Sequence, residues 1–332
     1  MMACVTGPLT TLEPLPPALP LPEAYDRHHP GADQRAVLAG LVGRRPWARL
    51  TWAALVEELL ALGRTDVALA KLAESHVDAV RILDQAGSRP EPGALYGVWA
   101  SRSAWTGLAA TEAADGGLEV SGTLRFTSGG GVLDRALVPV WLDEDHHVLL
   151  DLDVTGLDHD TSFWRTAAMA PTHTSEVRVE RLVVPASAQR GPVDFYLSRP
   201  GFWAGGAGVA ACWAGGAARV VDVLRAFHPR PNPAQQVRFG GLRADLAVAA
   251  GAVRAGARLL DDPTTDTTAV ALEVRTVVVQ AVHRVLASAR LLTGPTGLAL
   301  DDDVAHAVPD LELYTLQHNL DGALADLGTV EA

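Results

Sequence analysis

Residues 118–140 read LEVSGTLRFTSGGGVLDRALVPV. The apolar and β-branched residues at the two ends of this stretch predict strands over residues 118–126 and 136–141. Between the two strands lie Thr127, Ser128 and the three glycines at 129–131. Residues this small allow a flat ligand to approach the backbone closely. The stretch therefore predicts two strands and a bend that faces a ligand.

Helical patterns precede this stretch. Apolar residues recur with helical spacing after Thr51, which is placed to cap a helix that Gly63 is expected to end. Asp66 is placed to begin a second helix that runs to Gly87. Upstream, residues 7–22 contain six prolines, which exclude a helix and predict an extended arm or a disordered leader.

Apolar residues alternate with polar ones in several short segments between about residue 93 and Pro185, as Val177 and Val179 do with their neighbours. Such segments, separated by Gly, Asp and Pro clusters, predict a small antiparallel barrel or sandwich. Within it, residues 143–147 combine acidic and histidine side chains. We interpret them as a solvated turn and predict no metal site, because no second ligand cluster accompanies them.

Helical patterns return after Arg199. Residues 204–218 are mostly glycine and alanine. Because glycine weakens a helix by about 0.5–1 kcal/mol relative to alanine, this density indicates that another helix or a ligand packs very close to the backbone. Three more helices are predicted, near residues 235–260, 265–292 and 304–327.

The order of these elements predicts an α+β multi-domain chain. Its expected parts are a proline-rich leader or arm over residues 1–30, an N-terminal helical domain over 31–92, a middle antiparallel β-barrel or sandwich over 93–197 and a C-terminal four-helix bundle over 198–332.

Composition excludes several classes of protein. Asp and Glu (39) outnumber Lys and Arg (27), and no basic stripe is interleaved with aromatic residues, so we expect no nucleic-acid partner. The two cysteines, Cys4 and Cys212, do not indicate a disulfide framework. No stretch reaches the roughly 18 uninterrupted apolar residues of a spanning helix. The expectation is a cytoplasmic protein without a membrane span.

Several phrases of the sequence resemble the acyl-CoA dehydrogenase superfamily, over about residues 50–328. The order Gly122, Phe126, Ser128, Gly130 is similar to the family's strand beneath the flavin, although Leu124 stands where the family often has Lys. The chain is shorter than a typical member mainly in the N-terminal helical domain. The other phrases that carry the resemblance are residues 57–70, 169–177, 182–185 and Arg199-Pro200.

The resemblance implies a flavoprotein oxidoreductase with FAD between the β-domain and the C-terminal bundle. Phe126 and Ser128 then contact the cofactor, with the Ser128 hydroxyl close to flavin N5. Trp99 and Ser101 match the family's flavin-contacting turn, in which Arg102 replaces a glutamate. The family's reaction removes a proton from an acyl-CoA while hydride passes to the flavin, in a pocket that excludes water.

A second set of residues is implied to contact the FAD of a neighbouring subunit. Phe239 belongs to a phrase whose arginine meets the FAD pyrophosphate in the family, but Gln236 stands at the arginine position here. Gly294 and Gly297 match a glycine turn that closes on the same FAD, with Leu291 in place of the usual glutamine. The resemblance therefore implies a homodimer or homotetramer.

The position of the family's catalytic glutamate holds a histidine. Common members place that glutamate eight residues after an Asp, and here Asp310 is followed at that spacing by His318. A histidine with a pKa near 6.5 can exchange a proton at neutral pH. The resemblance implies catalytic roles for His318 and for Arg199, while Glu273 and Glu312 remain alternative bases.

Three functions stay open on the sequence. The first is a dehydrogenase-like enzyme that acts on an acyl-CoA-like small molecule and passes electrons to an acceptor. The second is a flavin monooxygenase of the same fold, with FAD or FMN and with His318 near the flavin. The third is a non-catalytic binding or assembly module that holds FAD weakly or not at all. The departures from the family at Arg102, Gln236, Leu291 and His318 favour it.

Overall fold

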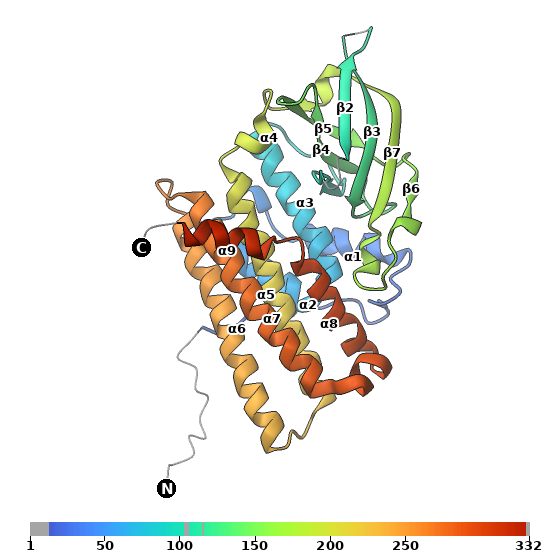
Figure 1. The fold of residues 1–332 in the computed structure, drawn as a ribbon. Helices are drawn as coiled ribbons and strands as arrows, with labels where there is room; N and C mark the ends of the chain where they lie inside the picture. The colour runs from blue at the N-terminus through green and yellow to red at the C-terminus, as the bar shows by residue number, and fades with distance from the viewer. Residues whose placement is uncertain (1–12, 103–105, 115, 330–332) are drawn as a thin grey trace.

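The computed structural model describes residues 13–102, 106–114 and 116–329. Figure 1 shows two regions, a sheet at one end of the molecule and a group of long helices at the other. Helix α3 (Val67–Gln85) lies between them, and its contacts with β1 (Tyr96–Val98) join the two regions. The order of helices, strands and helices that the sequence predicts is the order observed.

The N-terminal helices are α1 (Asp33–Val42), α2 (Trp52–Thr65) and α3. The expected caps are present, since Thr51 accepts a hydrogen bond from the backbone of Ala54 and Asp66 accepts one from Leu69. The prediction that Gly63 ends the first helix is wrong, because α2 continues to Thr65. Gly63 is instead a site of close helix packing.

The sheet contains the two strands predicted on either side of the bend at residues 127–131. Its strands run in the order β6-β7-β3-β2-β4-β5-β8, and β1 pairs with β4 outside this path. Most pairs are antiparallel, as predicted, but β1–β4 and β2–β4 are parallel. The remaining strands are β2 (Gly107–Glu112), β3 (Leu118–Thr127), β4 (Arg135–Trp141), β5 (His147–Asp153), β6 (His159–Asp160), β7 (Ser175–Val184) and β8 (Gln189–Arg190).

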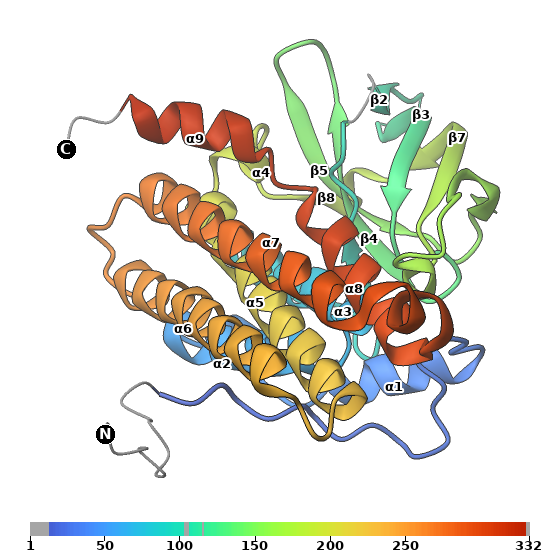
Figure 2. The same ribbon diagram turned by 60° about the horizontal axis from the view of Figure 1, so that its bottom comes forward.

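The C-terminal helices pack side by side, as Figure 2 shows. The predicted single helix over 304–327 is in fact two helices, and the break between them carries His318. Within α7, Gly294 adopts a non-helical conformation that kinks the helix. The helices are α4 (Phe195–Ser198), α5 (Gly201–Phe227), α6 (Pro233–Leu260), α7 (Thr267–Leu300), α8 (Asp302–Thr315) and α9 (Leu320–Gly328).

The glycine- and alanine-rich helix is α5, which packs against α2, α3, α6, α7 and α8. Its closest neighbour is α2. A Cβ built on Gly215 would lie 2.2 Å from the carbonyl oxygen of Leu60, and one built on Gly63 would lie 2.2 Å from that of Cys212. The small residues of α5 are therefore explained by another helix, and not by a ligand.

Helix α5 is also long and apolar enough to cross a membrane, and it is the one such helix in the described residues. Of its most apolar window, 83% is buried inside the protein. This burial is typical of a core helix.

Next to the bundle, the proline-rich segment from residue 13 onward is extended, and Arg64 and Arg254 bind its backbone carbonyl groups.

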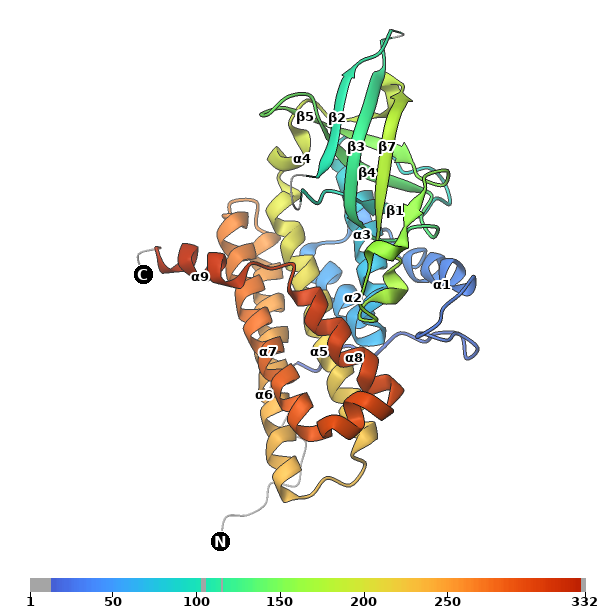
Figure 3. The same cartoon turned by 45° about the vertical axis from the view of Figure 1, so that its right-hand side comes forward.

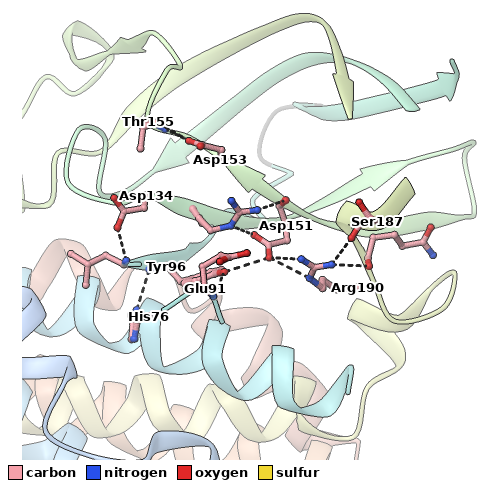
Figure 4. A network of polar contacts seen from close by, with 12 residues as sticks. His76, Glu91, Tyr96, Asp134, Asp151, Asp153, Thr155, Ser187 and Arg190 are labelled. Carbon is pink, nitrogen blue, oxygen red and sulfur yellow. Dashed lines mark hydrogen bonds and ion pairs between the residues drawn. The ribbon is translucent and has the colours of Figure 1, made fainter. Parts of the chain in front are cut away.

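A buried charge cluster holds the sheet together beside α3 (Figure 4). Asp151 on β5 accepts hydrogen bonds from Arg135 at 2.6 Å and from Arg190 at 2.9 Å, so it links β4, β5 and β8. The Tyr96 hydroxyl donates to the same carboxylate at 3.4 Å. On the helical side, His76 of α3 accepts a hydrogen bond from the backbone of Tyr96 at 3.0 Å.

Candidate functional site

A cavity of about 690 Å³ lies where the sheet meets the helices. This size is typical of a pocket for a small organic ligand or cofactor. One wall comes from the end of β3, the bend after it and the segment before β7, and the other wall comes from α3, α4 and α8. Figure 3 shows how these strands and helices are arranged. Its lining residues are Lys71, Val98, Ala100, Ser101, Phe126, Ser128, Trp164, Met169, Thr172, Thr174, Tyr196, Leu313, Tyr314, Leu316 and Gln317.

Ser128 presents a hydrogen-bond acceptor to this cavity. The Thr172 hydroxyl donates to the carbonyl of Met169 at 2.7 Å, so its proton is not free for another bond. The Thr174 hydroxyl, 2.7 Å away, must then donate to Thr172, and the Ser128 hydroxyl must donate to Thr174 at 2.8 Å. Because each hydroxyl has one proton and two lone pairs, the Ser128 oxygen keeps its lone pairs available.

Phe126 stands at the end of β3 in a left-handed backbone conformation, with φ of 60°. Its side chain is exposed beside the cavity and makes edge contacts with Phe163 at 5.5 Å and with Trp164 at 6.4 Å between ring centroids. These rings form an apolar wall. A flat aromatic ligand would find both a stacking surface here and a polar edge at Ser128.

The other two predicted cofactor residues on this side also lie near the cavity. Ser101 lines it and also lines a smaller neighbouring cavity of about 130 Å³. Trp99 lines only the smaller cavity, but its indole N–H donates to the carbonyl of Ser128 at 3.0 Å. Arg102 lies over the ring of Trp141 at 3.8 Å. The structure thus brings Phe126, Ser128 and Ser101 to one cavity, with Trp99 behind them.

His318 lies outside the main cavity. It lines a separate cavity of about 370 Å³, and Gln317 lines both. Nδ1 of His318 accepts a hydrogen bond from Arg275 at 3.3 Å, which leaves Nε2 to donate to the Thr276 hydroxyl at 3.3 Å. Burial, with a contribution from Arg275, lowers the pKa of His318 to about 4. A neutral imidazole with both nitrogens engaged is poorly suited to act as a base at neutral pH.

Arg199 also lies one layer behind the cavity. Its guanidinium is buried, with Asp78 at 3.4 Å and Gln85 at 3.1 Å. It lies 5.5 Å from the centroid of Tyr196, whose ring lines the cavity. In this arrangement Arg199 supports the position of Tyr196.

Phe239 is in the second turn of α6, and Gly294 and Gly297 are in the last part of α7. The start of α6 and the end of α7 lie at the end of the bundle away from the sheet (Figure 1). Arg225 lies over the ring of Phe239 at 5.7 Å, and a Cβ on Gly297 would meet Thr293 at 2.4 Å. None of the three lines the main cavity in this chain. Any contact with a cofactor would have to come from a second copy.

Sequence reasoning overlooked residues on the helical wall, above all Lys71 on α3 and Tyr314 on α8. The Tyr314 hydroxyl is buried and finds no hydrogen-bond partner among the described residues. Thr172 and Thr174 lie within residues 169–177, which resemble the family, so the resemblance could have pointed to them as site residues. The signal for Lys71 is compositional, since it is the only lysine in the sequence.

No protein-family model and no curated protein sequence matches the chain. Solved structures do resemble it. Methanesulfinate monooxygenase MsuC from Pseudomonas fluorescens superposes with a TM-score of 0.75 at 18% identity, over 90% of this chain and 89% of its own. Dibenzothiophene monooxygenase TdsC from Paenibacillus sp. A11-2 gives 0.72 at 18% identity, over 90% and 89%. Butyryl-CoA dehydrogenase from Megasphaera elsdenii gives 0.72 at 16% identity, over 92% and 89%.

The chain has the fold of the acyl-CoA dehydrogenase superfamily. The match spans the helices on both sides of the sheet, because it covers about nine-tenths of each chain. TdsC has been solved in a complex with FMN and indole. With the acyl-CoA dehydrogenase fold established, the main cavity is the feature of this chain with the size, the apolar walls and the polar edge that a ligand site requires.

Proposed function

We propose that the protein is a flavin-dependent oxidoreductase that acts on a small organic molecule. The observation that carries this proposal is the Ser128 oxygen, which offers free lone pairs to a large cavity walled by Phe126 and Trp164. A flavin ring system is flat, largely apolar on its faces and polar at its edges, so these residues fit it. The complex of the similarly folded TdsC with FMN adds support.

Phe126, Trp164, Ser128 and Ser101 are the residues that would hold the flavin ring in this site. A bound flavin supplies the capacity to accept hydride or, once reduced, to react with O₂. The protein supplies the binding surface, the hydrogen-bond acceptor at Ser128 and a wall that limits water. FAD and FMN share the ring that this site accepts, and both remain candidates.

We further propose oxygen transfer, and not acyl-CoA dehydrogenation, as the reaction. Dehydrogenation of an acyl thioester needs a base that takes a carbon-bound proton. No carboxylate or imidazole is present among the lining residues of the main cavity. His318 lies outside it, with a pKa near 4. The wall is better suited to hold an apolar substrate beside a flavin than to deprotonate one.

Flavin binding is the first test. We expect the protein, purified and incubated with FMN or FAD, to retain flavin absorbance between about 350 and 500 nm after gel filtration. Ser128→Ala removes the acceptor, so we expect flavin affinity to fall by about three- to tenfold, the value of one neutral hydrogen bond. Ser187→Ala, at an exposed serine outside the cavity, is the control and should bind as the wild type does.

The absence of flavin from every sample would overturn this proposal in favour of the non-catalytic module. If flavin binds Ser128→Ala as tightly as it binds wild type, the protein is still a flavoprotein, but the flavin ring does not contact Ser128. If flavin binds, oxygen consumption by the reduced protein separates a monooxygenase from a dehydrogenase that needs an electron acceptor.

We also propose that a second copy covers the far end of α6 and α7. Val237 on α6 is 77% exposed and Leu291 on α7 is 66% exposed, and a second copy would cover these apolar side chains. Light scattering is expected to give at least twice the chain mass of 34.9 kDa. The double variant Val237→Glu, Leu291→Glu should shift the protein towards the monomer. If the wild type is itself a monomer, Phe239, Gly294 and Gly297 do not contribute to the cofactor site.

A further inference from the structure

The 27 basic side chains of the sequence comprise 26 arginines and one lysine. That lysine, Lys71, lies on α3 and lines the main cavity. All other positive charge of the Lys and Arg side chains is supplied by arginine, so a lysine is not needed for solubility. We therefore look for the role of this lysine in the cavity that it lines.

Among the described residues, Lys71 forms no ion pair, and the acid that acts on its charge most is Glu74. Its ammonium lies 5.4 Å from the ring centroid of Tyr314, across the wall. In the part of the chain that the structure describes, its side chain has no ion pair and no hydrogen bond. Several of the more buried arginines, by contrast, are each paired with an acid: Arg135 with Asp151, Arg199 with Asp78, and Arg254 with Glu57.

The nearest acid on the same helix is Glu74, and it is a poor counter-charge. Burial, and then the neighbouring Asp78, raise the pKa of Glu74 to about 8. An ionised Glu74 carboxylate is therefore itself disfavoured by its buried surroundings. Burial also lowers the pKa of Lys71, which reflects the cost of an ammonium in a partly apolar site. An anion brought into the cavity would offset this cost.

The remaining lining residues restrict the kind of anion. Lys71 is the only charged side chain among them. A single cation suits a group with one negative charge, whereas a phosphate monoester carries about 1.5–2 charges at pH 7 and usually meets several donors or cations. Leu313 and Leu316 lie on the same wall and offer an apolar surface to the rest of the ligand.

We propose that the substrate of this cavity is a small organic carboxylate, whose charged group pairs with the ammonium of Lys71 while its apolar body lies against Leu313, Leu316 and Trp164. The proposal rests on the proposed function for the reaction, but the pairing itself does not require a flavin. It makes Lys71 a residue that determines substrate specificity.

Matched acids and amides test the pairing. Benzoate with benzamide, indole-3-carboxylate with indole-3-carboxamide, and hexanoate with hexanamide are titrated by calorimetry into wild type, Lys71→Met and Lys71→Arg. We expect at least one acid to bind wild type about tenfold or more tightly than its amide. Lys71→Met should lose that preference and keep amide affinity within about twofold, and Lys71→Arg should retain it. A panel in which no acid exceeds its amide on wild type overturns the proposal.

The single lysine permits a second measurement that needs no variant. Reductive methylation of wild type modifies only Lys71 and the N-terminal amine, and mass spectrometry of the digested peptides separates the two. The acid that binds should slow methylation of Lys71 at least severalfold, and its amide should not. Equal rates with acid and amide would contradict the pairing, even if Lys71→Met does not fold.

Both measurements are made with and without added flavin, so that the two proposals fail separately. A protein that binds no flavin but prefers the acid loses the proposed function and keeps the carboxylate site. A protein that binds flavin and shows no preference loses the carboxylate site alone.

Discussion

Gly215→Ala is expected to lower the free energy of unfolding by about 3 kcal/mol, at the upper end of what overpacking of a core costs. The added methyl would lie 2.2 Å from the carbonyl oxygen of Leu60 and 2.9 Å from Cα of Gly63. These are backbone atoms of α2, so no side-chain rotation can relieve the contact. The helices must separate, and the packing of α5 against α2 is lost with them.

Thermal and denaturant unfolding followed by circular dichroism measure this effect, with Gly251→Ala as the matched control. Gly251 lies on α6, is exposed, and a Cβ there meets no atom within 4 Å. Alanine should stabilise that helix by about 0.5–1 kcal/mol. If Gly215→Ala unfolds at the same midpoint as wild type, the close approach of α2 and α5 is refuted.

Asp151→Asn is expected to cost about 3 kcal/mol, because it leaves Arg135 and Arg190 facing each other without the carboxylate that both bind. The Asp151 side chain is only 1% exposed, so water cannot replace the lost charge. The amide has nearly the same shape, which confines the change to charge and hydrogen bonding. Both arginines are about one-fifth exposed, which keeps the loss at the lower end of the range for buried pairs.

Glu119→Gln is the matched control for this substitution. Glu119 pairs with Arg181, whose side chain is 80% exposed, and exposed pairs contribute about 0–1 kcal/mol. The unfolding midpoints of the two variants, measured by denaturant titration, should therefore differ clearly. A small loss for Asp151→Asn, equal to that of Glu119→Gln, would show that the cluster in Figure 4 does not hold the sheet together.

The sequence by itself determined the order of helices and strands and the sheet side of the site. Thr51 and Asp66 cap helices as predicted because capping involves neighbouring residues only. The strands around the bend follow from local alternation, and Ser128 and Phe126 reach the cavity because a bend after a strand places them there. The fold inferred from the resembling phrases is the fold observed.

Only the tertiary structure decided which helices complete the site. Lys71 and Tyr314 are far apart in sequence and meet because α3 and α8 pack against each other. His318, placed at the catalytic position by spacing, lies behind Gln317 because the chain turns between α8 and α9. Gly63 similarly serves packing against Cys212, and not the end of a helix. Local patterns specify which segments form helices and strands, whereas long-range packing determines which of their side chains share a cavity.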